Sequence, residues 1–396
     1  MTWTAFSACA MRIGIDVTAA VTQGGGIGRY TRELVHALVS IDEENVYRFF
    51  SARQPSVLPV PNPIPSAPNT QFRRAPFNER WLYRLWYRLR LPLPVQWLTG
   101  RLDLFHSPDF VLPPVSGRIP TLLTVHDLSF IHYPATFPQE LVTYLNEVVP
   151  RSIKRAAHVL ADSQATKDDL LGIWQVAPEK ITVLYSGVSS TFQPVTDASK
   201  LTAVREKYNL GKAPYTLSVG TIQPRKNYQM LIRAFAPVAA NWPHNLVIAG
   251  GKGWLYQDMM AEAARQRLEN RVRFLGFVDD ADLPALYSAA TLFVFPSLYE
   301  GFGLPLLEAM ACGVPVITSN TSSLPEVAGK LAGGQEPAVL LSPHEQAAWT
   351  ETIDQLLADS GRRAQLVAAG FQQVRRFTWT KAARRLLEIY RSLGSR

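Results

Sequence analysis

Residues 296–320 of the 396-residue chain read PSLYEGFGLPLLEAMACGVPVITSN. An apolar run ends at the start of this stretch, and Glu300 then opens a turn that contains two glycines. Pro305 suits the first turn of a helix, where its missing N–H would have no partner anyway. Gly313 ends that helix before the next apolar run. This order of strand, turn, helix and strand predicts a parallel α/β sheet whose carboxyl edge, the usual ligand-binding edge, carries the turn.

Two glutamates of this stretch are candidate binding residues. Seven residues separate Glu300 from Glu308, so Glu300 lies in the turn and Glu308 about one turn into the helix. A helix start favours a phosphate or a sugar oxygen. Glu300 can therefore reach a ligand in the crevice, and Glu308 can reach a vicinal diol such as ribose. Most glutamates are simply solvated, but the complete turn favours a binding site here.

The rest of the chain continues this alternation of short apolar runs and helical patterns. We expect strands at 11–17, 46–51, 103–107, 120–126, 157–162, 181–185, 215–220, 245–250, 272–277, 291–296 and 314–318. We expect helices at 28–39, 138–156 and 378–393 and after residues 227, 254, 282 and 305. Two such series predict two doubly wound α/β domains that meet within 188–212. Six prolines within 55–68 indicate a linker or a surface loop.

Composition limits the classes of protein that the chain can be. With 47% apolar and 18% charged residues it can bury a core, which excludes a disordered or collagen-like chain. The sequence contains no run of eighteen apolar residues, so we expect no transmembrane helix. Two cysteines make no disulfide framework, and a reducing, cytoplasmic compartment is the simpler expectation. Residues 1–10 lack the basic start of a secretory signal, and Met11 is a candidate natural start.

The formal net charge of +8 is concentrated in two segments. Residues 72–101 contain seven arginines and one glutamate, and residues 362–396 contain nine basic residues and one glutamate. The remainder of the chain is mildly acidic. A basic balance by itself is compatible with nucleic acid, an anionic membrane or a phosphorylated small molecule.

The first basic segment includes an amphipathic pattern at 79–90, ERWLYRLWYRLR. We expect one helical stripe to hold its tryptophans and leucines and another to hold its arginines. Such a helix suits the headgroup layer of an anionic membrane. It equally suits a helix that packs on the first domain and exposes its charges to water.

A second candidate site is GTIQPRKN at 220–227, which directly follows a predicted strand. Arg225 and Lys226 leave the strand end beyond a glycine and a proline, so they point to the same sheet edge as Glu300. The planar fork of arginine and the point charge of lysine together suit a diphosphate. An Arg-Lys pair in a polar loop is often only solvated, but this position favours a site.

Two features of the first half are open to two interpretations each. The loop QGGGIGRY at 23–30 is similar to the dinucleotide fingerprint, but the third small residue would fall on Thr31. It is either a loop that lets a phosphate or an acceptor approach the backbone, or a bare tight turn. His126 ends a predicted strand and either donates to a sugar hydroxyl or departing phosphate oxygen, or satisfies a local contact.

Asp280 and Asp282 are similar to the paired aspartates that hold a metal-bound nucleotide in some sugar transferases. A helical pattern follows Asp282, which is better explained as a helix cap. Elsewhere the sequence has no cluster of His, Cys and Asp with ligand spacing. We therefore expect no metal.

Taken together, these motifs resemble the large retaining glycosyltransferase family 4. The resemblance rests on the 296–320 stretch, the GTIQPRKN loop, the glycine loop GGGIGRYT and the strand end HDLSFIHYP, and it covers about 11–394. It implies the GT-B fold, in which two facing Rossmann-like domains hold the active site between them. The expected parts are an acceptor-side domain at 11–190, a nucleotide-sugar domain at 191–376 and a final helix at 377–396 that crosses back onto the first domain.

The same resemblance implies roles for individual residues. Arg225 and Lys226 would hold the diphosphate and stabilise the leaving group, Glu300 would lie by the donor sugar and Glu308 would bind the ribose. The other implied contacts are Phe302, Gly303 and Leu304 with the sugar or phosphate, Phe277 and Val278 with the base, Gly25 and Gly26 with the phosphates, and His126 with the donor sugar. Gln223 departs from the family pattern, in which many members carry glutamate.

The leading functional hypothesis is transfer of a hexose to a lipid-linked or oligosaccharide acceptor in surface polysaccharide synthesis. The resemblance is nearest to bacterial mannosyltransferases that use GDP-mannose, with retention and without a metal or other cofactor. UDP-glucose or another UDP-sugar is the alternative donor, and a sugar-nucleotide epimerase shares the architecture. The broken fingerprint and the lack of an acid–base pair disfavour a nicotinamide-dependent oxidoreductase. The Glu300 turn argues against nucleic acid as a partner, whereas 79–90 suggests peripheral contact with the inner face of the cell membrane.

Overall fold

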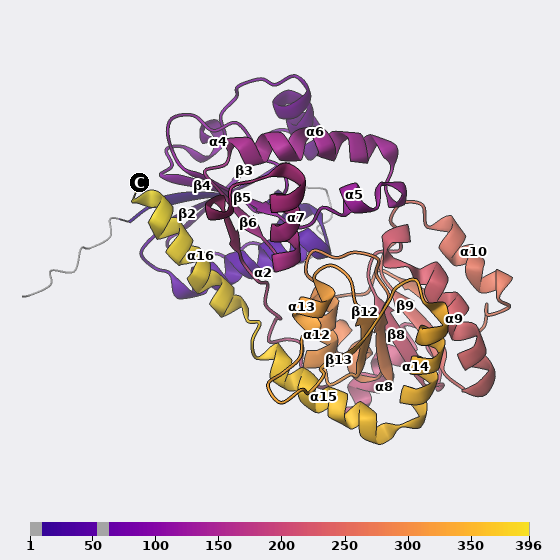
Figure 1. Ribbon diagram of the computed structural model, residues 1–396. Coiled ribbons are helices and arrows are strands. Elements are labelled where there is room, and N and C mark those ends of the chain that lie inside the picture. Colours follow the sequence, from indigo (N-terminus) through magenta and orange to yellow (C-terminus); the bar gives the residue numbers. More distant parts are fainter. Residues whose placement is uncertain (1–9, 54–62, 396) are drawn as a thin grey trace, which may run out of the picture.

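The computed structural model describes residues 10–53 and 63–395, which form two α/β domains (Figure 1). The first domain contains a seven-stranded sheet in the order β3-β2-β1-β4-β5-β6-β7. The second contains a six-stranded sheet in the order β10-β9-β8-β11-β12-β13. The strand pairs in both sheets are parallel. In each sheet the order reverses beside the first strand, which creates the crevice where such sheets bind ligands.

The strands are short, and most are buried on both faces, as helices on both sides of a parallel sheet require. Those of the first sheet are β1 (Arg12–Asp16), β2 (Val46–Ser51), β3 (Thr70–Arg74), β4 (Leu104–Ser107), β5 (Thr121–Val125), β6 (His158–Ala161) and β7 (Ile181–Val183). Those of the second sheet are β8 (Tyr215–Val219), β9 (Asn245–Ala249), β10 (Val272–Gly276), β11 (Leu292–Phe295), β12 (Val316–Ser319) and β13 (Ala338–Leu341).

Helices connect the strands and cover the two faces of each sheet. The α-helices of the first domain are α1 (Thr18–Thr22), α2 (Gly26–Ile41), α3 (Glu79–Tyr83), α4 (Gln96–Thr99), α5 (Ser129–His132), α6 (Gln139–Arg155) and α7 (Gln164–Trp174). Those that follow are α8 (Ala198–Lys207), α9 (Tyr228–Asn241), α10 (Gln257–Arg265), α11 (Leu283–Ser288), α12 (Leu304–Ala311), α13 (Leu324–Ala328), α14 (Gln346–Ala358), α15 (Ser360–Val374) and α16 (Trp379–Gly394). A π-helical turn, η1 (Arg84–Arg88), continues α3, and a 3-10 turn, η4 (Pro224–Lys226), precedes α9.

Each predicted strand corresponds to an observed strand, but β3 and β13 were not predicted. Both are edge strands with one hydrogen-bonded neighbour each. The β3 sequence, TQFRR, is largely exposed, because an edge strand can form its ladder without an apolar run. The proline-rich segment and the N-terminal segment lie largely outside the described residues, over 55–62 and 1–9.

The last helix crosses back onto the first domain, as expected. In Figure 1 the helix α15 lies on the lower domain, whereas α16 runs up along the other one. The buried side chains of α16, among them Leu386 and Tyr390, pack with Ile13 and Leu34 in the core of the first domain. The Nδ1 atom of His106 on β4 lies 2.8 Å from the Tyr390 hydroxyl.

Two connections therefore join the domains. Leu184 belongs to the core of the first domain and Phe192 to the core of the second. The returning chain passes beside the first connection, where Val188 pairs with Thr378. The boundary predicted between residues 190 and 191 falls in this connection and stays a prediction.

The single apolar stripe predicted for 79–90 is wrong. Leu82 and Trp86 are buried in the core of the first domain, whereas Trp81 and Leu89 are exposed. Trp81 points about 100° away from its neighbour Leu82 around α3. Leu89 lies beyond η1, which ends at Arg88. None of the helices in the described part of the chain combines the length and hydropathy that crossing a bilayer requires.

Candidate active site

A cleft of about 740 Å³ lies between the two domains. Residues from motifs that are far apart in the sequence converge on it. The predicted site residues that line it are Gly25, Gly26, His126, Arg225, Lys226, Phe277, Val278, Glu300, Phe302, Gly303, Leu304 and Glu308. The first three come from the first domain and the others from the second. The structure thus brings the whole predicted set together, while the role of each residue stays a prediction.

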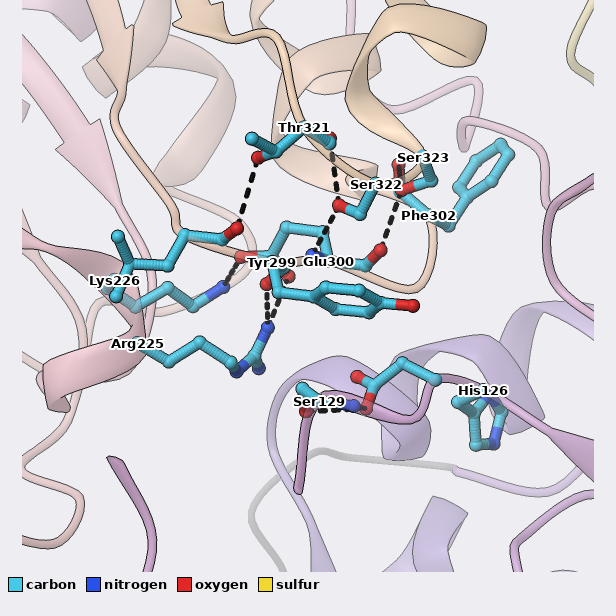
Figure 2. Close-up of polar contacts among 12 residues, drawn as sticks. His126, Ser129, Arg225, Lys226, Tyr299, Glu300, Phe302, Thr321, Ser322 and Ser323 are labelled. Atoms are coloured by element: carbon cyan, nitrogen blue, oxygen red, sulfur yellow. Dashed lines mark hydrogen bonds and ion pairs between the residues drawn. The ribbon is translucent and has the colours of Figure 1, made fainter. Parts of the chain in front are cut away.

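The turn that carries Glu300 is shaped by its glycines and held by serines. Gly303 precedes α12 with a φ of 106°, a left-handed conformation that favours glycine. A Cβ atom on Gly301 would lie only 2.1 Å from the carbonyl oxygen of His126, so this glycine permits the first domain to approach. The Ser323 hydroxyl donates to the Glu300 carbonyl at 2.9 Å (Figure 2). These contacts fix where the Glu300 carboxylate points.

Arg225 and Lys226 pair directly with the Glu300 carboxylate. The Lys226 Nζ atom lies 2.6 Å from Oε1 and an Arg225 terminal nitrogen lies 3.1 Å from Oε2 (Figure 2). Burial raises the pKa of Glu300, but the two cations outweigh it and lower the pKa to about 2. The cluster has two positive charges and one negative charge; Lys226 and Glu300 are buried, and the Arg225 side chain is 12% exposed. Its net positive charge at a sheet edge is suited to a diphosphate.

His126 lies across the cleft from this cluster (Figure 2). Both of its ring nitrogens have partners. Nδ1 lies 2.7 Å from an Asp162 carboxylate oxygen and Nε2 lies 3.2 Å from the Pro108 carbonyl oxygen. Burial lowers the pKa of His126, but the charge of Asp162 and the hydrogen bond to it raise the pKa to about 9. Both partners can accept hydrogen bonds, so the two contacts fit an imidazolium that donates twice. A ligand would have to take the place of the Pro108 carbonyl to receive the Nε2 proton.

Glu308 lines the cleft from the middle of α12, and its carboxylate also has partners. Tyr287 donates to Oε2 at 2.9 Å, and Arg29 from α2 of the first domain forms an ion pair with Oε1. Arg29 forms a second ion pair, with Asp280. Arg29 was not predicted as a site residue. Its position in the first turn after the glycine loop was the one available signal, because that turn faces the ligand edge of the sheet.

Gln223 is a second cleft residue to which the sequence assigned no role. Its side chain lines the cleft and is buried. The side-chain oxygen has no hydrogen-bond partner among the described residues. A buried acceptor without a partner is uncommon in folded proteins and marks a place where a ligand hydroxyl can donate.

Asp280 and Asp282, the pair that is similar to a metal-binding motif, contact basic residues instead. Asp282 stands at the N-cap position of α11, as expected, but its side chain does not cap the helix. It accepts instead from Tyr208 at 2.7 Å and from Lys207 at 2.5 Å. Asp280 pairs with Arg29. Among the described residues no group of three or more His, Cys, Asp or Glu side chains is arranged to hold a metal ion.

Comparison with known proteins identifies the family. The family model described as Glycosyltransferase Family 4 matches residues 24–192, and the one described as Glycosyl transferases group 1 matches residues 202–373. O-antigen chain mannosyltransferase B of Escherichia coli is 34% identical over 375 residues, which cover 93% of this chain and 96% of that protein. The chain belongs to glycosyltransferase family 4.

Other similar proteins agree with this assignment. O-antigen chain mannosyltransferase RfbU of Salmonella typhimurium is 29% identical over 86% of this chain and 89% of its own. Sucrose-phosphate synthase from Thermosynechococcus elongatus shares the fold, with a TM-score of 0.75 at 23% identity over 97% of this chain and 99% of that one. This family 4 protein is therefore a glycosyltransferase with the GT-B fold, and the cleft between its domains is the candidate active site.

Proposed function

We propose that this glycosyltransferase transfers mannose from GDP-mannose, with retention, to a lipid-linked or oligosaccharide acceptor during synthesis of a surface polysaccharide. The observation that carries the proposal is the buried cluster of Arg225, Lys226 and Glu300 at the cleft edge. The names of the two mannosyltransferases support mannose as the sugar. GDP-mannose is a substrate in this proposal, and no resident cofactor is needed.

The charges of the cluster suggest how the donor is held. A diphosphate beside Arg225 and Lys226 gains charge-assisted hydrogen bonds, which strengthen as negative charge develops on the leaving group. Glu300 holds the two cations in place and lies where the sugar hydroxyls would be. In same-face transfer the bond from the sugar carbon C1 to the phosphate oxygen breaks. The acceptor oxygen bonds to the same face of C1 and its proton passes to the departing phosphate, so no separate general base is required.

Binding of nucleotides to the purified protein tests the donor. In a thermal-shift series with GDP, UDP and NAD, GDP is expected to stabilise the protein most. A ligand at one hundred times its Kd stabilises by about 2.7 kcal/mol. Lys226→Met is expected to remove most of this stabilisation, because the diphosphate loses its point charge. Lys330→Met is the matched control, since Lys330 is an exposed lysine that does not line the cleft.

The outcomes separate the alternatives. A larger shift with UDP than with GDP would replace GDP-mannose by a UDP-sugar. A response to NAD alone would contradict a nucleotide-sugar donor, and an unchanged GDP response in Lys226→Met would remove Lys226 from the site. Retention is tested on the product: GDP-α-mannose must give an α-linked mannoside in the NMR spectrum, and a β-linked product would contradict it.

The proposal includes contact with an anionic membrane through the first domain. Five large apolar side chains within 77–97 remain exposed, and seven arginines lie within 72–101 of the same chain segment. We call these residues the basic aromatic surface; its apolar members are Phe77, Trp81, Leu89, Leu91 and Trp97. Trp97 is 71% exposed and Leu89 61%. Exposed tryptophans among arginines are typical of a surface that rests in the headgroup layer of an anionic bilayer.

A further inference from the structure

Arg29 connects the two domains at the edge of the cleft. It lies in the first turn of α2, directly after the glycine loop, and its guanidinium forms ion pairs with Glu308 and Asp280 of the second domain. The guanidinium carbon also lies 5.7 Å from the centre of the Phe192 ring. The Arg29 side chain is only 15% exposed. Two carboxylates and an aromatic ring of the opposite domain therefore enclose it, unlike the exposed surface pairs that contribute little.

The Arg29 contact falls on the carboxylate that the proposed function assigns to ribose. Both oxygens of Glu308 already accept hydrogen bonds, Oε1 from Arg29 and Oε2 from Tyr287. The Glu308 side chain is 3% exposed, so water cannot readily replace a lost partner. Each carboxylate oxygen can accept two hydrogen bonds, so a ribose hydroxyl that donates to Glu308 shares an oxygen with Arg29 or Tyr287, or displaces one of them. Arg29 has a second carboxylate partner, Asp280, to which its guanidinium can turn.

The start of α2, which carries Arg29, is fixed to the glycine loop. Arg32, three residues further along α2, donates to the carbonyl oxygens of Gln23 at 2.6 Å and of Gly24 at 2.9 Å. These bonds hold the loop against the start of α2, so the loop, the helix start and Arg29 form one unit. Asp280 lies 3.9 Å from the Arg32 guanidinium, so it faces two cations of this unit.

We infer that Arg29 is a positioning residue that holds the Glu308 carboxylate while the donor is absent and competes with the ribose of the donor for it. The inference rests on the proposed role of Glu308. Ribose binding weakens the Arg29–Glu308 ion pair, and Asp280 retains the guanidinium. Because such coupling is reciprocal, removal of Arg29 must increase what a ribose hydroxyl contributes to binding.

The ratio of the Kd values for 2′-deoxy-GDP and GDP measures that contribution. Calorimetric titration of the full chain with both nucleotides gives the ratio for the wild type and for Arg29→Met, a substitution that keeps a long apolar stem. We expect Arg29→Met to raise the ratio about tenfold, which is a typical size for coupling between two sites. Arg29→Lys, which keeps the charge, is expected to restore much of the wild-type ratio.

Arg12→Met is the matched control. It removes an arginine ion pair of the first domain, in which a guanidinium nitrogen of Arg12 lies 2.6 Å from Asp103, and neither residue lines the cleft. The control is expected to leave the ratio unchanged. A purely structural role of Arg29 would lower the melting temperature and leave the ratio as in the wild type, which would overturn the inference.

Failure of the proposed function gives a different result. If Glu308→Gln leaves the ratio unchanged, Glu308 does not bind the ribose and its assigned role is wrong. If the wild type binds neither nucleotide, the donor assignment fails. UDP and 2′-deoxy-UDP are titrated alongside, so that the test of Arg29 does not depend on the base.

Discussion

The raised pKa of His126 makes the free energy of unfolding depend on pH. Its pKa of about 9 lies above the ordinary histidine value of about 6.5, because the Asp162 carboxylate stabilises the imidazolium. The stabilisation from this pair is therefore complete below about pH 6.5 and is lost as the pH rises through about 9. We expect the free energy of unfolding of the wild type to fall by up to about 3 kcal/mol between pH 6 and pH 10 on this account.

Urea denaturation of the wild type and of His126→Asn at both pH values isolates this contribution, since other groups titrate in both proteins. The gap in stability between the two proteins is expected to be large at pH 6 and small at pH 10. An equal gap at both pH values would show that the ring is not an imidazolium in the folded protein.

At the scale of single residues, the sequence indicates site residues that lie within one recognisable motif. It does not indicate residues whose partners lie in the other domain. Glu300, Arg225 and Lys226 could be predicted because each follows a strand at the ligand edge. Their mutual ion pairs could not, because 74 residues separate Lys226 from Glu300. The same holds more strongly for Arg29, whose partner Glu308 is 279 residues away.

At the scale of elements, the segment that contains α3, η1 and α4 leads to a test of membrane contact. Trp81 and Trp97 belong to the basic aromatic surface, and the Arg84 guanidinium lies 5.1 Å from the Trp81 ring centre. We expect the double substitution Trp81→Ser and Trp97→Ser to weaken binding to phosphatidylglycerol vesicles at least about tenfold, because two buried aromatic contacts with the headgroup layer are lost. Vesicle sedimentation measures this binding.

The control for this experiment is the double substitution Ile173→Ser and Leu255→Ser, which removes two exposed apolar side chains outside the basic aromatic surface. It is expected to bind as the wild type does. Equal binding of all three proteins, or equal binding of the wild type to neutral vesicles, would contradict the membrane proposal.

The helical turns α3 and η1 show why a sequence pattern alone does not decide how an element packs. A periodic pattern indicates that a helix forms and that one side of it is apolar. It does not show which apolar side chains of the pattern meet the domain, because that depends on the partner surface. Leu82 and Trp86 lie in the core, whereas Trp81 and Leu89 are exposed. The edge strand β3 was missed for a related reason, since its pairing is decided by its neighbour β2 and not by its own sequence.

At the scale of the whole molecule, both domains could be predicted because their strands and helices alternate locally along the chain. The cleft between them depends on contacts between distant residues. Tyr299 beside the Glu300 turn hydrogen-bonds to Asp169 of the first domain and stacks on His132, with 5.0 Å between ring centres. Nothing local to either segment indicates this pairing, so the relative position of the domains follows only from the folded structure.

The return of α16 to the first domain makes the end of the chain part of its core. Tyr390 is fully buried there, and its hydroxyl meets His106, which burial keeps neutral by lowering its pKa to about 3. Tyr390→Phe leaves His106 without this partner and is expected to lower the free energy of unfolding by about 1 to 2 kcal/mol.

Tyr390→Ala also opens a cavity and is expected to lower the free energy of unfolding by about 3 to 5 kcal/mol. In calorimetry this corresponds to a fall of about 10 °C in the transition of the first domain. Stabilisation of the second domain by GDP is expected to persist. Arg391→Ala, on the exposed side of the same helix, is the control. An equal fall in both transitions would show that α16 stabilises the two domains as one unit.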